Sequence, residues 1–194
     1  GTYRRLSYKP WYAVAEFVDN STQSYFDHRS ELKDDPNFSK LVINIRHDSA
    51  EKKLEITDNA FGMNLENFRR ALILDKPPKN TTGRNEFGMG LKTAACWFGN
   101  LWSVETSELG SNECYSATMD IRKFEKENID SVDLITSHVP FEQHYTKITI
   151  TDLNSPMAQT AVRKTKDYLQ KMYRKDIQSG EIDIIWNGEY LDYE

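Results

Sequence analysis

Cysteine is scarce in this 194-residue chain, which contains only 2, Cys96 and Cys114. Because they form no closely spaced pair, they exclude a disulfide framework and a cysteine-based zinc centre. They are typical of small buried side chains in a reducing compartment. The 4 histidines show no metal-ligand spacing either. We therefore expect a protein of the cytoplasm, or of the nucleus in a eukaryote.

Long apolar runs are also missing. No run approaches the ~20 residues that cross a bilayer, and no signal-peptide pattern stands at the start, so we expect no membrane partner. A net charge of -5 disfavours a wide nucleic-acid-binding face and leaves only local basic patches open. The 38% of hydrophobic and 28% of charged residues are typical of one globular domain over residues 1–194.

Helical and strand periodicities follow one another along the chain, with a polar stretch, DKPPKNTTGRN, in the middle. The pattern predicts an α+β fold, a two-layer sandwich with helices on one face of a mixed, largely antiparallel sheet. Gly99 is the expected stop of the helix before it. The expected elements are helices at 10–28, 64–74, 90–98 and 155–180, strands at 41–47, 53–58, 101–107, 114–122 and 146–153, and a closing hairpin at 181–191 that turns on Asn187 and Gly188.

The first helix carries a polar stripe beside its apolar face. Glu16 and Asn20 lie one turn apart, so both side chains reach the same point in space. A carboxylate and an amide presented together suit a general base and an oxygen ligand for a hard cation such as magnesium. The alternative is a solvated polar stripe, which would also include Asp19, Gln23 and Asp27.

Two polar side chains share strand parity with apolar residues. Asp58 alternates with Leu54 and Ile56, so it faces the interior at the end of its strand. A carboxylate buried there needs a hydrogen-bond donor, such as an adenine amino group. Thr146 shares parity with Ile148 and aims a hydroxyl at the buried side. A turn-forming Asp-Asn pair and an ordinary packed threonine are the alternatives.

A glycine pair lies between the polar stretch and the next helix. Gly88, Met89 and Gly90 lead into Leu91 and Lys92, so free backbone N–H groups meet the positive end of a helix. Glycine also allows close backbone approach, which makes the segment a candidate anion site. Its spacing matches neither the P-loop nor the dinucleotide-binding loop, and a plain loop-to-helix junction is the alternative.

In this order, the segments AEFVDNSTQ, ITDNAFGM, NEFGMGLK and YTKITITDL resemble the four ATP-site motifs of the GHKL superfamily. Gyrase B, heat-shock chaperone ATPases, histidine kinases and MutL share this Bergerat fold. The resemblance covers nearly the whole chain, with a lid-like loop at about 75–90 between the second and third motifs. The segments WYAVAEFVDNS and RRALILDKPPKNTTGRNEFGMGLK look most like the MORC and MutL branch.

The resemblance implies a role for each matched residue. Glu16 would be the general base that activates water, and Asn20 would hold Mg²⁺ against the phosphates. Asp58 would accept the amino proton of adenine. The other matched positions would contact the nucleotide: Gly62, Met63 and Thr146 at the base, and Gly88, Met89, Gly90 and Leu91 at the phosphates, with Lys92 beside them.

Three positions depart from the family's pattern. Ala60 stands where the second motif usually has its first glycine, at a cost of roughly 1 kcal/mol if that residue needs a positive φ. Asn85 stands where several relatives have a glycine, and Gln23 where the chaperone branch has an aspartate. None of the three carries a chemical role, so ATP binding is expected and the hydrolysis rate stays open.

The resemblance thus implies a Mg²⁺-dependent ATPase that is slow as an isolated domain. It would close its lid over ATP, pair as a homodimer with ATP bound, and come apart on hydrolysis, as the N-terminal part of a longer protein. DNA would be reached through other domains of that protein. The alternatives are a non-hydrolysing module that responds to the nucleotide and a histidine-kinase-like phosphotransfer domain. Glu16 disfavours both, because a sensor has no need of that carboxylate and those kinases typically lack it.

Overall fold

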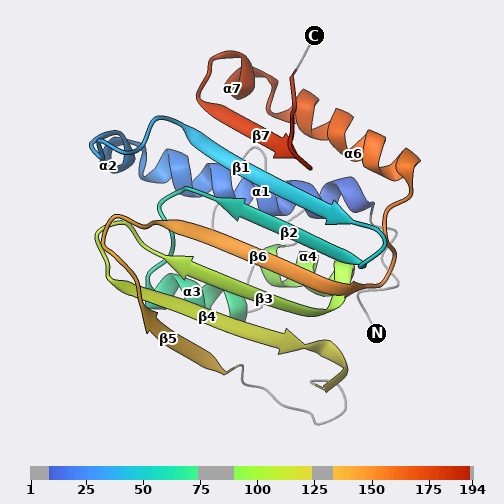
Figure 1. The fold of residues 1–194 in the computed structure, drawn as a ribbon, viewed down its shortest axis with the longest axis horizontal. Coiled ribbons are helices and arrows are strands. Elements are labelled where there is room, and N and C mark those ends of the chain that lie inside the picture. The colour runs from blue at the N-terminus through green and yellow to red at the C-terminus, as the bar shows by residue number, and fades with distance from the viewer. Residues whose placement is uncertain (1–8, 74–89, 124–132, 193–194) are drawn as a thin grey trace.

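The computed structural model describes residues 9–73, 90–123 and 133–192. Its strands form one eight-stranded sheet in the order β5-β4-β3-β6-β2-β1-β7-β8 (Figure 1). Neighbouring strands run antiparallel except β1 and β7, which are parallel. The strands are β1 Leu41–Asp48, β2 Lys53–Asp58, β3 Gly99–Ser107, β4 Glu113–Asp120, β5 Leu134–His138, β6 Tyr145–Leu153, β7 Ile182–Trp186 and β8 Glu189–Tyr190.

The helices form the second layer. In Figure 1, α1, α3 and α4 lie behind the sheet, and α1 contacts both α4 and α6. The expected α+β sandwich with a mixed, largely antiparallel sheet is therefore confirmed. The helices are α1 Pro10–Asp27, α2 Arg29–Lys33, α3 Leu65–Ile73, α4 Gly90–Phe98, α6 Gln159–Met172 and α7 Arg174–Gln178.

The core lies between α1 and the sheet. Val14 and Val18 of α1 and Leu54 and Ile56 of β2 are at most 1% exposed, because the helical and strand periodicities turn them toward each other. The same alternation carries Asp58, the last residue of β2, into the interior at the edge of this core, where it is 6% exposed.

Helix α4 ends at Phe98, directly before Gly99, as expected. Gly99 is not a left-handed helix cap, however, because it is the first residue of β3 and its φ is not positive. A Cβ added there would lie 2.6 Å from Cγ2 of Ile150 and 2.7 Å from the carbonyl oxygen of Thr151, both on β6. The position therefore needs glycine because β6 approaches closely, and the helix passes directly into the strand.

The helix expected at 155–180 differs in two ways. It begins at Gln159, because Met157 packs into the core at 4% exposure and Ala158 is extended. It is also interrupted at Tyr173, which has φ -107° and ψ 18° and is fully buried. Its hydroxyl donates to the Asp19 carboxylate on α1, so one tertiary hydrogen bond fixes the break between α6 and α7.

The closing hairpin is confirmed. Asn187 and Gly188 have φ of 47° and 85°, the left-handed pair that a tight two-residue turn requires. Strand β5 was not expected, because all its residues but the first are exposed and leave no period-two apolar pattern. It covers the outer edge of β4.

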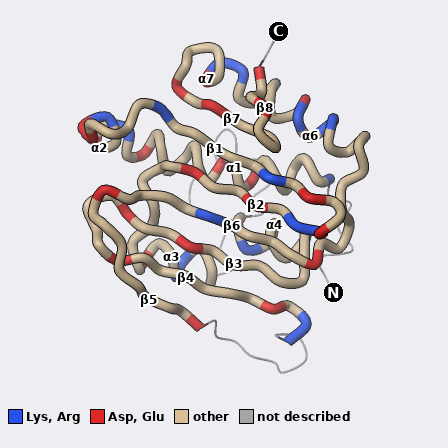
Figure 2. Tube along the Cα trace, viewed as in Figure 1, with Lys and Arg blue, Asp and Glu red and all other residues tan. Residues whose placement is uncertain are grey.

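Charges of both signs are interspersed over the described part of the chain (Figure 2). Several pair between neighbouring segments, as Lys40 does with Asp183 at 3.4 Å and Arg122 with Asp152 at 3.0 Å. Both cysteines are buried, as the sequence predicts.

Candidate functional site

The polar stripe of α1 divides into a buried and an exposed half. Glu16 is 4% exposed and Asp19 is 7% exposed, whereas Gln23 and Asp27 lie at the surface, where the Gln23 amide donates weakly to Asp27 at 3.4 Å. The alternative of a solvated stripe therefore holds only for the second half. The first half is enclosed by the protein, so it is the part of the stripe that can form a site.

Asn20 follows Asp19 on α1 and is half-buried. Its side-chain Nδ2 is buried and makes no hydrogen bond within the described part of the chain. An unpaired buried amide is costly, and it fits a polar ligand at this point. Because Glu16 lies one turn before it, a carboxylate and an amide oxygen are available together, which is a suitable donor set for Mg²⁺.

Asp58 is buried, as its strand parity predicts, and several donors surround it. Ser21 Oγ donates to Oδ2 at 2.5 Å, and the Ala60 N–H donates to Oδ1 at 2.9 Å. Burial raises the pKa of the Asp58 carboxyl, while the bonds from Ser21, Ala60 and the Thr146 backbone oppose the shift. A carboxylate offers about four acceptor positions, so one remains for a further donor.

Ser21 is a site residue that the motif comparison did not identify. It follows Asn20 and falls on the apolar face of α1, three residues after Val18. A hydroxyl on a core-facing position was the available signal, because a buried hydroxyl needs a partner. That partner, Asp58, could not be assigned without knowing that the end of β2 lies against α1.

The turn after β2 is held from β3. Gly62 has φ 81°, and a Cβ there would lie 1.9 Å from the carbonyl oxygen of Ser107. The N–H of Met63 donates to Thr106 Oγ1 at 3.0 Å. Ala60 does not have a positive φ, so alanine carries no conformational cost where the family usually has glycine. Glycine at 62 is thus required by the protein's own packing.

Thr146 is placed beside Asp58. The two residues pair across β2 and β6, and on its other side Thr146 pairs with Thr106 of β3. The hydroxyls of Thr106 and Thr146 lie 2.9 Å apart. The structure therefore connects the second and fourth motifs, with Thr106 as a further member that the sequence did not single out.

The third motif is described only from Gly90 onward. Gly90 begins α4 with φ 75°, Leu91 is 6% exposed, and Lys92 is half-buried. Because α4 packs against α1, this helix start belongs to the same layer as Glu16. Gly88 and Met89, Asn85 and the remainder of the expected lid at about 75–90 lie outside the described residues.

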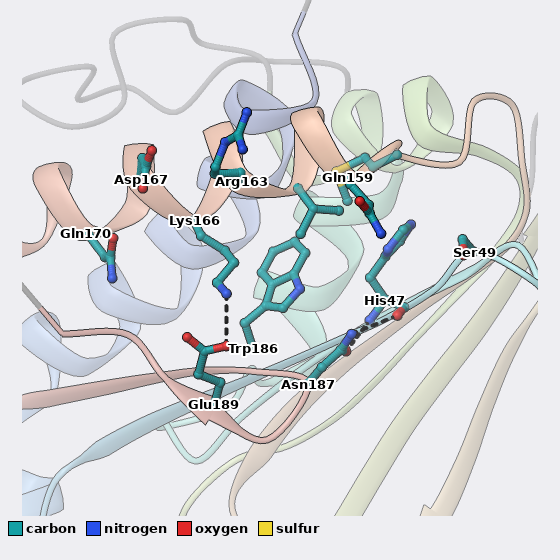
Figure 3. Close-up of a pocket in the computed structure, with 12 residues that line it drawn as sticks. His47, Ser49, Gln159, Arg163, Lys166, Asp167, Gln170, Trp186, Asn187 and Glu189 are labelled. Carbon is teal, nitrogen blue, oxygen red and sulfur yellow. Dashed lines mark hydrogen bonds and ion pairs between the residues drawn. The ribbon is translucent and has the colours of Figure 1, made fainter.

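A separate cleft of about 620 Å³ lies between α6, the β7–β8 hairpin and the end of β1 (Figure 3). Trp186 and His47 stand in it, and Lys166 pairs with Glu189 across its mouth at 3.0 Å. His47 Nε2 is buried and unpaired within the described chain, and burial lowers the pKa of this imidazole. None of the predicted site residues lines this cleft.

Comparison with known proteins gives one family. A model described as "Histidine kinase-, DNA gyrase B-, and HSP90-like ATPase" matches residues 8–155, well over half of the chain. This range contains all the site residues predicted from the sequence. No curated protein matched the chain. Within the described residues, no helix is both long and apolar enough to pass through a membrane.

Proposed function

Because the chain belongs to the family of histidine kinase-, DNA gyrase B- and HSP90-like ATPases, we propose that it binds ATP with Mg²⁺ and hydrolyses it to ADP and phosphate. The observation that carries the proposal is the buried Asp58 carboxylate, which sits beside Thr146 with an acceptor position left over. An adenine amino group supplies the missing donor. Gly62 and Met63 shape the turn against which the base packs.

The reacting end of the nucleotide lies along α1. Glu16 acts as the general base toward water, because it is a buried carboxylate one turn from the cation ligand. Asn20 presents its amide to Mg²⁺, which neutralises charge that develops on the phosphates. Gly90, Leu91 and Lys92 meet the phosphates at the start of α4, together with Gly88 and Met89.

The broader behaviour follows from the same assignment. The loop at about 75–90 closes over ATP, and two copies pair while ATP is bound, each as part of a longer protein. The phrases shared with the MORC and MutL branch support a DNA-linked role for that protein through its other domains. Only the resemblance supports these points.

The test compares variants that remove a charge from a buried and from an exposed position of α1. Glu16→Gln is isosteric at a buried position, so it should leave ATP affinity unchanged and slow phosphate release by about 10²- to 10⁴-fold. Glu16→Ala should do the same. Asp27→Asn removes the same charge from an exposed position of the same helix and should change neither quantity.

Each result has a definite meaning. Unchanged phosphate release in Glu16→Gln refutes the assignment of the base. A wild-type protein that binds ATP but releases no phosphate identifies the non-hydrolysing module instead. Binding is measured by calorimetry, and turnover by phosphate release with Mg²⁺ present and after its removal by a chelator, which should abolish turnover.

A further inference from the structure

His144 lies just before β6 and is in contact with the turn that follows Asp58. Its Nδ1 is 2.7 Å from the carbonyl oxygen of Ala60, and its Nε2 is 3.2 Å from Oδ2 of Asp35. The side chains of His144 and Asp35 are 8% and 12% exposed. Three segments far apart in the sequence therefore meet at one imidazole.

The two contacts determine how many protons the imidazole ring of His144 carries. A backbone carbonyl and an ionised carboxylate only accept hydrogen bonds, whereas a neutral imidazole donates only one. The other oxygen of Asp35 already accepts from the Asn37 N–H at 3.0 Å, as expected for a carboxylate. Both contacts of His144 are hydrogen bonds only when both ring nitrogens carry a proton.

The residue that His144 holds is itself bonded to Asp58. Ala60 donates its N–H to the Asp58 carboxylate and accepts from His144 with its carbonyl. The next residue, Phe61, donates to Ser24 Oγ at 3.2 Å and accepts from the Leu109 N–H at 2.9 Å. The turn is thus fixed from α1, from the end of β3 and from His144.

We propose that His144 is a positioning residue of the nucleotide site, which acts as an imidazolium and holds the Asp58 turn through Ala60 while Asp35 balances its charge. The proposal rests on the ATP-binding function proposed above. His144 does not touch the ligand. It sets the position of the Asp58 carboxylate, and its positive charge favours the ionised form of Asp58.

Two acidic side chains of the described residues interact with this imidazole: Asp35, from the segment after α2, and Asp58, from β2. The ring of Phe38 lies 6.0 Å away, centroid to centroid. Both charged neighbours are acidic, so they balance the charge of a doubly protonated ring.

The first experiment needs no nucleotide. Nitrogen-15 spectra of the histidine rings and hydrogen exchange of the Phe61 and Leu109 amides are recorded on the same nucleotide-free sample. We expect His144 to show two protonated nitrogens in the state in which these amides are protected. A singly protonated ring together with protected amides overturns the proposal.

The second experiment compares ATP with inosine triphosphate, which lacks the adenine amino group. His144→Ala should weaken ATP binding by about tenfold and change inosine triphosphate binding little, because the Asp58 turn reads that amino group. His138→Ala removes an exposed histidine from the end of β5 and should affect neither. Equal losses for the two nucleotides in His144→Ala show a merely structural role and refute the positioning.

Asp35→Asn tests the charge without removing the contact. Its amide can donate to a neutral ring while Nδ1 still donates to Ala60, so ATP affinity should be kept and the His144 ring should carry one proton instead of two. A ring that keeps both protons in this variant contradicts the role of Asp35 in holding the imidazolium. If the wild-type protein binds no ATP at all, the proposed function fails, and the nucleotide-free spectra still decide the state of His144.

Discussion

Replacing Asp58 by asparagine should reverse the base preference of the site. The amide is isosteric with the carboxylate, so its oxygen can still accept from the Ala60 N–H, which donates to Oδ1 at 2.9 Å. The NH₂ group then replaces Oδ2 and donates to Ser21 Oγ, which lies 2.5 Å away and turns from donor to acceptor. The contacts with Ala60 and Ser21 survive Asp58→Asn, whereas the acceptor for adenine becomes a donor.

The magnitude follows from one hydrogen bond to a charged group. Such a bond contributes about 1.5–3 kcal/mol, so Asp58→Asn should weaken ATP binding by about 10- to 150-fold. Inosine triphosphate carries an oxygen where adenine carries its amino group, so the variant should bind it better than the wild type does. Calorimetric titration of both nucleotides into both proteins measures the reversal. An unchanged ratio of the two affinities would refute the adenine assignment.

Stability gives an independent measurement on the same variant. Burial raises the folded-state pKa of Asp58, so its ionisation lowers the free energy of unfolding as the pH rises through that raised value. Asp58→Asn has no proton to lose. Its melting temperature should therefore equal or exceed that of the wild type at neutral pH, and the difference should shrink toward acid pH. A clear loss of stability at neutral pH would show that the carboxylate serves the fold.

Two further predictions concern the frame of the site. Gly62→Ala places a Cβ 1.9 Å from the Ser107 carbonyl and should lower the free energy of unfolding by more than about 3 kcal/mol, whereas Gly110→Ala, at φ 86° with open space around it, should cost only about 1–2 kcal/mol. Tyr173→Phe removes the donor to buried Asp19 and should lower the free energy of unfolding, measured in urea, by about 1–3 kcal/mol. Tyr190→Phe, at a 59% exposed position, should leave it unchanged. Equal unfolding curves within either pair of variants would contradict the corresponding contact.

The site residues that are placed by strand or helix periodicity were predictable from the sequence. Two-residue alternation along β2 places Asp58 inside, and helical spacing on α1 brings Glu16 and Asn20 together. The fold class follows from the same patterns, because each element buries one face. These properties depend on local periodicity, so they can be predicted without knowing which elements pack against one another.

The parts that depend on a single tertiary contact were not predictable. Ser21 meets Asp58, and Tyr173 meets Asp19, only because α1 packs against the sheet and against α6. Gly99 looks like a helix stop in sequence, and only the close approach of β6 gives its actual reason. His144 carries no motif at all, and its two oxygen partners come from distant segments.

The parallel pairing of β1 with β7 has a consequence for how the chain is made. On the edge of β1 that faces away from β2, residues 41–45 pair with residues 182–186, so this edge stays open during synthesis until residue 186 has left the ribosome. The family match ends at residue 155, before α6 and β7. A fragment cut at that limit would hold every motif, yet it would leave β1 and one side of α1 uncovered and prone to aggregate. The smallest useful fragment therefore extends through the hairpin, beyond the family's shared sequence.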